Sequence, residues 1–90
     1  MITDTLYRKY NIRQDVIETL ERYVVHRIPT GGFLHAVLTN NLMEAMHRAD
    51  PENKAALAEI CEFVYWELPS ICWGSKKIVD DWLYNKPKEN

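Results

Sequence analysis

The apolar residues of this chain recur at intervals of three and four, the spacing that places them on one face of an α-helix. The pattern covers most of residues 12–26, 31–48, 51–67 and 76–84. No stretch shows the alternation of apolar and polar residues, bounded by turn residues, that is typical of a strand. The sequence therefore predicts an all-α fold, a small bundle of four main helices in which short connections make successive helices neighbours.

Prolines and capping residues predict where the helices begin and end. Pro29 and Pro69 favour the ends of the first and third helices, since the residue before a proline is disfavoured in the α region. Asp50, followed by Pro51, and Ser75 favour the starts of the third and fourth helices. Their side-chain oxygens can accept hydrogen bonds from the free N–H groups of a first helical turn, and a proline suits the first helical position.

The second segment contains an interruption at residues 39–41, where three weak helix formers follow one another. Asn41 and Glu44 also have the spacing of a capping box, which would start a new helix. The apolar period nevertheless continues across the asparagines to Leu42 and Met46. We therefore expect one continuous, bent helix with both of these side chains on its buried face, and two short helices are the alternative.

Ninety residues indicate one domain, residues 1–90, with a polar tail at about 85–90. Residues 1–11 are expected to form either a short extra helix capped by Thr3 or Asp4, or a segment that lies across the core. No apolar run approaches the ~18 residues that a bilayer requires, and the N-terminus lacks the basic-then-apolar order of a signal peptide. We therefore expect a cytoplasmic protein without a membrane partner.

Charge and residue types argue against several functional classes. The net charge of −2 gives no basic footprint for nucleic-acid binding. His26, His35 and His47 stand in no metal-binding motif, and the spacing of Cys61 and Cys72 fits neither a zinc site nor a disulfide framework. Cys61 falls in the apolar pattern of its helix, which predicts a packed thiol. The sequence predicts no catalytic residue, no metal and no cofactor, and hence no enzyme.

One candidate contact site precedes the second helix, in the string RIPTGG. A helix N-terminus offers unpaired N–H groups and the positive end of the helix dipole, and glycines let a phosphate approach the backbone. Thr30 would cap the helix or contact the ligand beside Gly31 and Gly32, and Arg27 would supply charge. The pattern predicts a site for a phosphorylated small molecule such as a nucleotide messenger. A tight turn that needs glycine is the alternative.

A second candidate lies in the string SICWGS, residues 70–75. An aromatic residue beside a glycine in a loop can form a stacking platform, which would make Trp73, Gly74 and Ser75 ligand contacts. The alternative is that Trp73 plugs one end of the bundle. In an up-down bundle this loop and PTGG would lie at the same end, which predicts one site made by both loops.

A third candidate lies on the third helix. Phe63, Tyr65 and Trp66 cannot all face one core, since consecutive helical residues point about 100° apart, so we expect at least one of them on the surface. Tyr65 and Trp66 are predicted as a face for another protein or for a second copy of the chain. The alternative is ordinary packing with the polar tips of the rings in water.

The string IPTGGFLHAVLTNNLMEAMHRADPEN, with CWGS further on, resembles short proteins of unassigned function encoded in bacteriophage and prophage genomes. These share a P-x-G-x-F-L-x-A-V-L-x-N-x-L-x-x-A-x-x-R-A-D core, and the resemblance covers about residues 20–83. The matching residues are Pro29, Gly31, Phe33, Leu34, Asn40, Leu42, Arg48, Asp50, Trp73 and Gly74. The resemblance implies a phage or mobile-element origin and action in the cytoplasm of an infected bacterium, and it carries no catalytic residues.

These features together predict a small non-enzymatic binding protein of phage type that blocks a host or phage protein, such as a defence or replication factor. An exposed aromatic and acidic helix face would make the contact. One alternative is a sponge for a phosphorylated small molecule at PTGG. Another is a structural or packaging-associated phage protein, for which a homo-oligomer is expected.

Overall fold

The computed structural model describes residues 10–84, and within this range it contains helices and no strand. The all-α prediction is therefore confirmed. The α-helices are α2 (Gln14–His26), α3 (Gly32–Leu38), α4 (Leu42–Arg48), α5 (Pro51–Ala55), α6 (Leu57–Glu67) and α7 (Lys76–Tyr84), with a 3₁₀ helix, η1 (Ser70–Cys72), before α7. The expected tail at 85–90, and all but the last two residues of the segment expected to carry an extra helix, lie outside the described residues.

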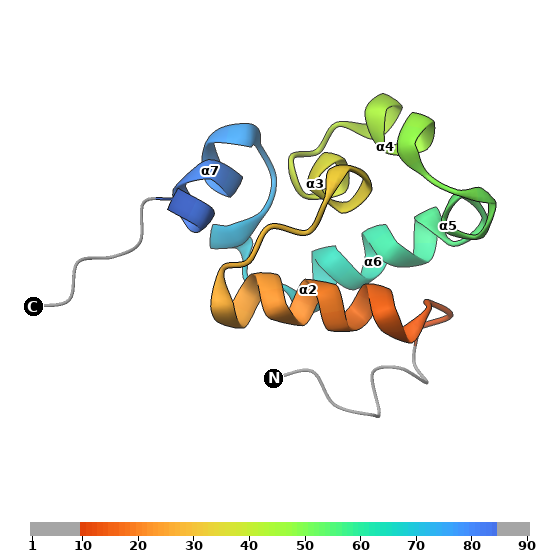
Figure 1. Cartoon of the computed structure of the whole chain (residues 1–90), viewed down its shortest axis with the longest axis horizontal. Helices are drawn as coiled ribbons and strands as arrows, with labels where there is room; N and C mark the ends of the chain where they lie inside the picture. The colour runs from red at the N-terminus through yellow and green to blue at the C-terminus, as the bar shows by residue number, and fades with distance from the viewer. Residues whose placement is uncertain (1–9, 85–90) are drawn as a thin grey trace, which may run out of the picture.

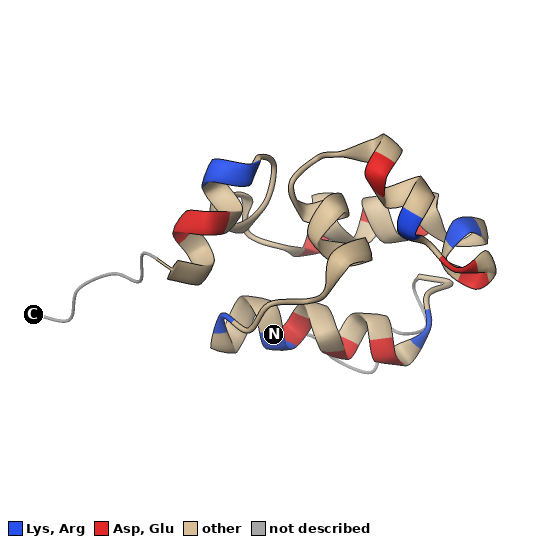
Figure 2. Cartoon of the chain, turned by 45° about the horizontal axis from the view of Figure 1, so that its top comes forward, with Lys and Arg blue, Asp and Glu red and all other residues tan. Residues whose placement is uncertain are grey.

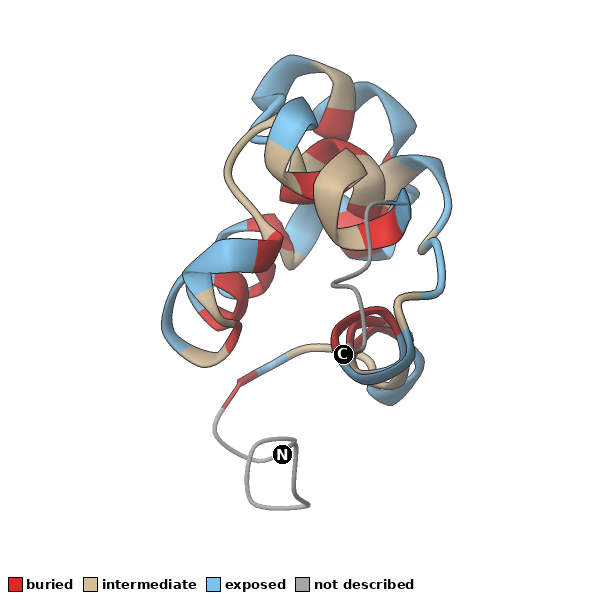
Figure 3. Cartoon of the chain, turned by 90° about the vertical axis from the view of Figure 1, so that its left-hand side faces the viewer, coloured by how far each residue is buried: buried red, intermediate tan, exposed pale blue. Residues whose placement is uncertain are grey.

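The helices enclose a shared apolar core. α2 lies along one side of the molecule next to α6, and α7 and the α4–α5 pair lie at opposite ends with α3 between them (Figure 1). Buried residues lie on the sides of the helices that face their neighbours (Figure 3). The largest fully buried side chains are Ile17, Leu20, Tyr23, Leu38, Ile60, Phe63, Cys72 and Val79. Removal of these apolar side chains from water is the main force that holds the helices together.

The second predicted helix is two helices, α3 and α4. Asn40 adopts a left-handed conformation, with φ +63, and ends the helical path. The Asn41 side-chain oxygen then accepts a hydrogen bond from the backbone N–H of Glu44 at 3.3 Å and starts α4. The continuous helix is wrong and the capping-box alternative is confirmed, because asparagine tolerates positive φ and caps helices well. With α4 redirected, Leu42 and Met46 are 60% and 41% exposed instead of buried.

The third predicted helix also divides. Ala56, with φ −97 and ψ 4, separates α5 from α6. The outer bounds agree with the prediction: Asp50 caps α5 by accepting a hydrogen bond from the N–H of Asn53 at 2.8 Å, and α6 ends at Glu67, before Pro69. Local capping signals thus placed the ends correctly, while the interruption inside the segment carries no proline or glycine to announce it.

The first and last helices lie close to their predicted ranges. The hydroxyl of Ser75 accepts a hydrogen bond from the N–H of Ile78 at 3.1 Å and starts α7, as predicted. α2 begins at Gln14, two residues later than expected, and ends at His26. It ends there because Arg27 adopts a left-handed conformation, with φ 55 and ψ 45.

The two cysteines differ in burial. Cys61 is exposed, so its predicted packing is wrong. The core-facing side of α6 is centred on Ile60, Phe63 and Val64, and Cys61 lies at the edge of this side. The apolar residues of this helix cover so much of its surface that their spacing does not distinguish the centre of the buried side from its edge. Cys72 is buried, and its Sγ donates to the carbonyl oxygen three residues earlier at 3.0 Å. Burial raises the pKa of the Cys72 thiol to about 11.

Long-range hydrogen bonds join the C-terminal part of the fold to the end of α2. The Tyr23 hydroxyl donates to the carbonyl oxygen of Cys72 at 2.6 Å, and the indole N–H of Trp82 donates to the carbonyl oxygen of Tyr23 at 2.9 Å. The Arg27 guanidinium donates to the carbonyl oxygen of Trp82 at 3.1 Å, and its central carbon lies 3.7 Å from the centroid of the Trp82 ring. We call Tyr23, Arg27 and Trp82 the α2–α7 contact.

Candidate functional site

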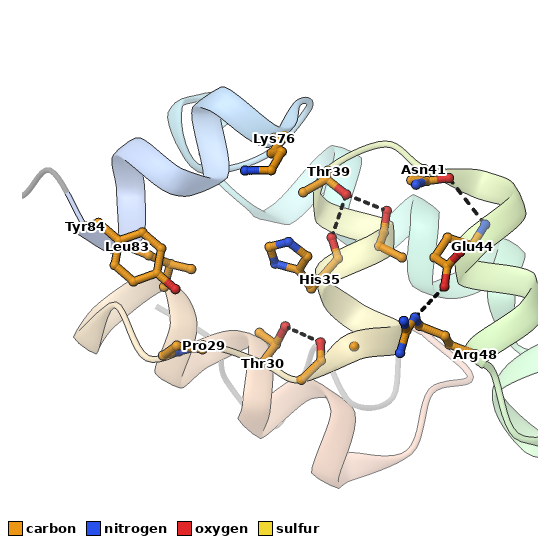
Figure 4. Close-up of a pocket in the computed structure, with 13 residues that line it drawn as sticks. Pro29, Thr30, His35, Thr39, Asn41, Glu44, Arg48, Lys76, Leu83 and Tyr84 are labelled. Carbon is orange, nitrogen blue, oxygen red and sulfur yellow. Dashed lines mark hydrogen bonds and ion pairs between the residues drawn. The ribbon is translucent and has the colours of Figure 1, made fainter.

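An open cleft of about 570 Å³ lies between α7 and the α3–α4 pair (Figure 4). We call it the α3–α7 cleft. Three residues predicted as ligand contacts, Thr30, Gly31 and Gly32, lie on its wall. The full lining is Pro29, Thr30, Gly31, Gly32, His35, Ala36, Thr39, Asn41, Glu44, Arg48, Lys76, Leu83 and Tyr84. The volume is within the ~300–1,000 Å³ that small-molecule sites occupy.

The charges of this cleft come from its two ends. α3 carries no lysine, arginine, aspartate or glutamate, whereas α4 and α7 each carry both signs of charge (Figure 2). Arg48 Nε is 2.6 Å from a carboxylate oxygen of Glu44, and Lys76 Nζ is 2.7 Å from one of Asp80. The hydrogen bond to Asp80 raises the pKa of Lys76. Each cation already has a carboxylate beside it, so an anionic ligand would compete with these pairs, which are exposed and therefore exchange readily.

The start of α3 does not have the cap predicted for it. Gly31 is the N-cap residue, and the Thr30 hydroxyl donates to the Gly31 carbonyl oxygen at 3.3 Å instead of accepting from the helix. α3 is seven residues long, so only about two turns of peptide units contribute to the helix dipole at its N-terminus. A Cβ atom at Gly32 would lie 2.9 Å from Nη1 of Arg48. The Arg48 side chain thus lies in the space next to the second glycine, where a Cβ atom would displace its flexible end.

Backbone conformation accounts for the first glycine, which gives a testable difference between the two. Gly31 has φ +94 and ψ 170, a region that residues with a Cβ essentially do not enter. Gly31→Ala is therefore expected to lower the free energy of unfolding by about 1–3 kcal/mol in urea denaturation. Gly32→Ala is the matched control, because the flexible end of Arg48 can move aside. Equal losses in both variants would contradict this account of Gly31.

The other predicted contacts lie elsewhere. Arg27 belongs to the α2–α7 contact. Trp73, Gly74 and Ser75 are not among the described residues that line the cleft. The Gly74 N–H donates to the carbonyl oxygen of Leu38 at 2.7 Å, which places this loop at the C-terminal end of α3, whereas PTGG is at the N-terminal end. The expectation that both loops lie at one end is wrong, because α3 lies between them.

The cleft also contains residues that the sequence did not indicate: His35, Arg48, Lys76 and Tyr84. Figure 4 shows His35 in the middle, Tyr84 and Lys76 on the α7 side and Arg48 on the α4 side. They come from three helices, and no short motif links them. The one available signal was Gly32, whose missing side chain leaves room for Arg48.

A second feature is the outer surface of α6. Tyr65 and Trp66 are 60% and 67% exposed, so the prediction that at least one aromatic of this helix lies on the surface is confirmed. Their rings meet edge to face with centroids 4.9 Å apart, and the ring of the half-buried Trp73 lies 5.8 Å from that of Tyr65. The indole N–H of Trp73 donates to the carbonyl oxygen of Leu68 at 3.3 Å. We call Tyr65, Trp66 and Trp73 the aromatic face.

A hollow of about 500 Å³ borders the aromatic face. Its lining is Tyr10, Glu59, Glu62, Trp66 and Glu67. The Tyr10 hydroxyl donates to a carboxylate oxygen of Glu67 at 2.7 Å. Burial raises the pKa of Tyr10 to about 12, with further contributions from Glu67, Glu62 and Glu59. We call this the acidic hollow.

These pKa shifts predict loss of stability in alkali. Tyr10 and Cys72 have pKa values in the fold above their ordinary values of 10.0 and 9.0, so the fold favours their protonated forms. This stability is present below about pH 9 and is lost as the pH rises toward about 12. We expect the melting temperature to fall over this range, and to fall less steeply above about pH 10 in Tyr10→Phe. An unchanged pH profile in that variant would contradict the assignment.

Other site types find no support in the described part of the chain. Residues 10–84 contain no group of three histidine, cysteine, aspartate or glutamate side chains placed to hold a metal ion. Nor does this range include a helix with the length and apolar character needed to cross a membrane. In comparisons with models of protein families, with curated proteins and with solved structures, none matches this chain.

Proposed function

We propose that this chain is a small non-enzymatic binding protein of phage type that blocks a host or phage protein through the aromatic face. The observation that carries the proposal is the exposure of Tyr65 and Trp66 side by side on α6. Large aromatic side chains are enriched in the energetically dominant centres of protein interfaces. The phage assignment is supported by the resemblance of the PTGG-to-RAD string.

The arrangement of the rings favours a contact surface. The ring of Tyr65 contacts the rings of both Trp66 and Trp73, so these contacts already restrict its rotation before a partner covers it. Trp73 is itself held by its hydrogen bond to Leu68. An apolar surface that is already ordered binds with a smaller entropy cost than a flexible one, such as the exposed Met43 of α4.

The proposal is tested by removing the two exposed rings. The free energy of unfolding of Tyr65→Ser/Trp66→Ser is expected to differ from that of the native protein by no more than about 0.5 kcal/mol. The partner is first identified by pull-down from the bacterial host and then purified. The Kd of the same variant for this partner is expected to rise by about 30-fold or more. Val25→Ser/Met43→Ser is the control, since it removes exposed apolar side chains from α2 and α4. Equal affinity of both variants for the partner would refute the proposal.

A second candidate function is binding of a phosphorylated small molecule in the α3–α7 cleft. It is supported by the placement of Thr30, Gly31 and Gly32 on one wall with Arg48 and Lys76 at the two ends. Calorimetry with a panel of nucleotides tests it, and Lys76→Gln should weaken any binding seen. Absence of heat at millimolar nucleotide would remove this candidate without affecting the first.

The structural or packaging role predicts self-assembly of the chain. Sedimentation of the purified protein at high micromolar concentration distinguishes the cases. A monomer would remove both the packaging role and the homo-oligomer, while leaving the blocking function in place.

A further inference from the structure

We infer that the partner presents a basic segment to the aromatic face, with arginine side chains against Glu59 and Glu62 and one guanidinium stacked on Trp66. This inference rests on the proposed function and names the chemistry of its partner. It concerns the border where the aromatic face meets the acidic hollow.

The first support is the placement of the groups. Glu59, Glu62 and Trp66 are three and four residues apart on α6, so they lie on one side of the helix, one turn above another. All three are exposed and line the acidic hollow. A single segment lying along α6 would therefore touch both carboxylates and the indole ring.

The second support is that these two carboxylates are uncompensated. Within the described residues, neither Glu59 nor Glu62 has an ion pair, whereas the carboxylates of α4, α5 and α7 are paired with lysine or arginine: Glu44 with Arg48, Glu52 with Arg13, Asp80 with Lys76 and Asp81 with Lys77. Their negative potential reaches the Tyr10 hydroxyl in the same hollow, where it favours the protonated form. A partner with positive charge here would gain two attractive contacts, and an acidic partner would meet two repulsive ones.

The third support is the indole ring beside the carboxylates. A guanidinium can stack on an aromatic ring while its N–H groups reach a carboxylate, which an ammonium does less well. The molecule uses the same chemistry internally, where the Arg27 guanidinium lies 3.7 Å from the Trp82 ring centroid. A second copy of this chain fits less well, because a two-fold contact centred here would bring Glu59 and Glu62 near their own copies.

The test uses the full chain and two synthetic amphipathic helical peptides as probes. Both carry the same leucine stripe, and one has arginine at the flanking positions where the other has glutamate. The arginine peptide is expected to bind about tenfold more tightly than the glutamate peptide, and more weakly as salt rises. Glu59→Gln/Glu62→Gln should weaken binding of the arginine peptide about fivefold. Glu18→Gln/Glu21→Gln on α2 changes the net charge equally and should leave binding unchanged.

Two results would overturn the inference. The first is equal binding of the arginine and glutamate peptides. The second is equal weakening of arginine-peptide binding by the α2 and α6 variants, which would indicate an effect of net charge alone.

The purified partner separates this inference from the proposed function. If Tyr65→Ser/Trp66→Ser abolishes partner binding and Glu59→Gln/Glu62→Gln leaves it unchanged, the blocking function stands and the basic chemistry is wrong. If Tyr65→Ser/Trp66→Ser leaves partner binding unchanged, the proposed function itself fails.

Discussion

Phe63→Ala is expected to lower the free energy of unfolding by about 3–5 kcal/mol. Phe63 is completely buried at the centre of the α6 face, and its ring lies edge to face against Tyr10, with centroids 5.2 Å apart. Truncation removes this contact and leaves a cavity that the surrounding helices fill only in part. A chain of ninety residues has a total stability of roughly 5–13 kcal/mol, so this variant should lose a large share of it.

Urea denaturation followed by far-ultraviolet circular dichroism measures this loss. Trp66→Ala is the matched control, because Trp66 is on the same helix three residues later and is 67% exposed. The control should change the free energy of unfolding by about 0.5 kcal/mol or less. If Trp66→Ala were as costly as Phe63→Ala, the ring would be packed in solution and the aromatic face would not be free to bind a partner.

Trp82→Ala should have the next largest effect, a loss of about 3 kcal/mol. The substitution removes the hydrogen bond to the Tyr23 carbonyl oxygen and the stacking of Arg27, together with the half-buried ring itself. α7 would then be held mainly by Val79 and Leu83. Because α7 forms one wall of the α3–α7 cleft, any small-molecule binding there should be lost as well.

Hydrogen exchange tests this prediction, because it measures the protection of the backbone amides of each helix separately. Amide protection in α7 should fall more than protection in α2 and α6, since α7 loses its long-range anchor. Trp82→Phe keeps an aromatic ring, although a smaller one, and loses the N–H donor, so it should cost less than Trp82→Ala, about 1 kcal/mol for the lost hydrogen bond. A uniform loss of protection across all helices would show that α7 unfolds with the rest of the domain, contrary to the expected local release.

Part of the candidate site could be anticipated from single residues. Tyr65 and Trp66 are adjacent on a helix whose other side must face the core, so surface exposure near them follows from helical geometry alone. Glycine at residue 31 likewise indicated a special backbone, which its φ of +94 bears out. The rest of the cleft could not be anticipated, because His35, Arg48 and Lys76 come from three helices with no common pattern.

The sequence by itself determined what depends on neighbouring residues. Apolar spacing determined the all-α class, and Asp50, Pro69 and Ser75 determined helix ends, because capping and proline effects act within a few residues. The break at Asn40 is also local: the left-handed conformation of this asparagine outweighs the apolar period that continues across it.

The tertiary structure decided how the helices pack against one another and which of their flanks are covered. Tyr23 bonds to Cys72 across 49 residues and Trp82 bonds to Tyr23 across 59. The Arg27 guanidinium, predicted as a ligand contact, donates instead to the carbonyl oxygen of Trp82. These contacts set α7 opposite α3 and leave the outer side of α6 uncovered. A local pattern of residues indicates the side of a helix that faces the core, but burial at the edge of that side depends on packing between segments far apart in the chain.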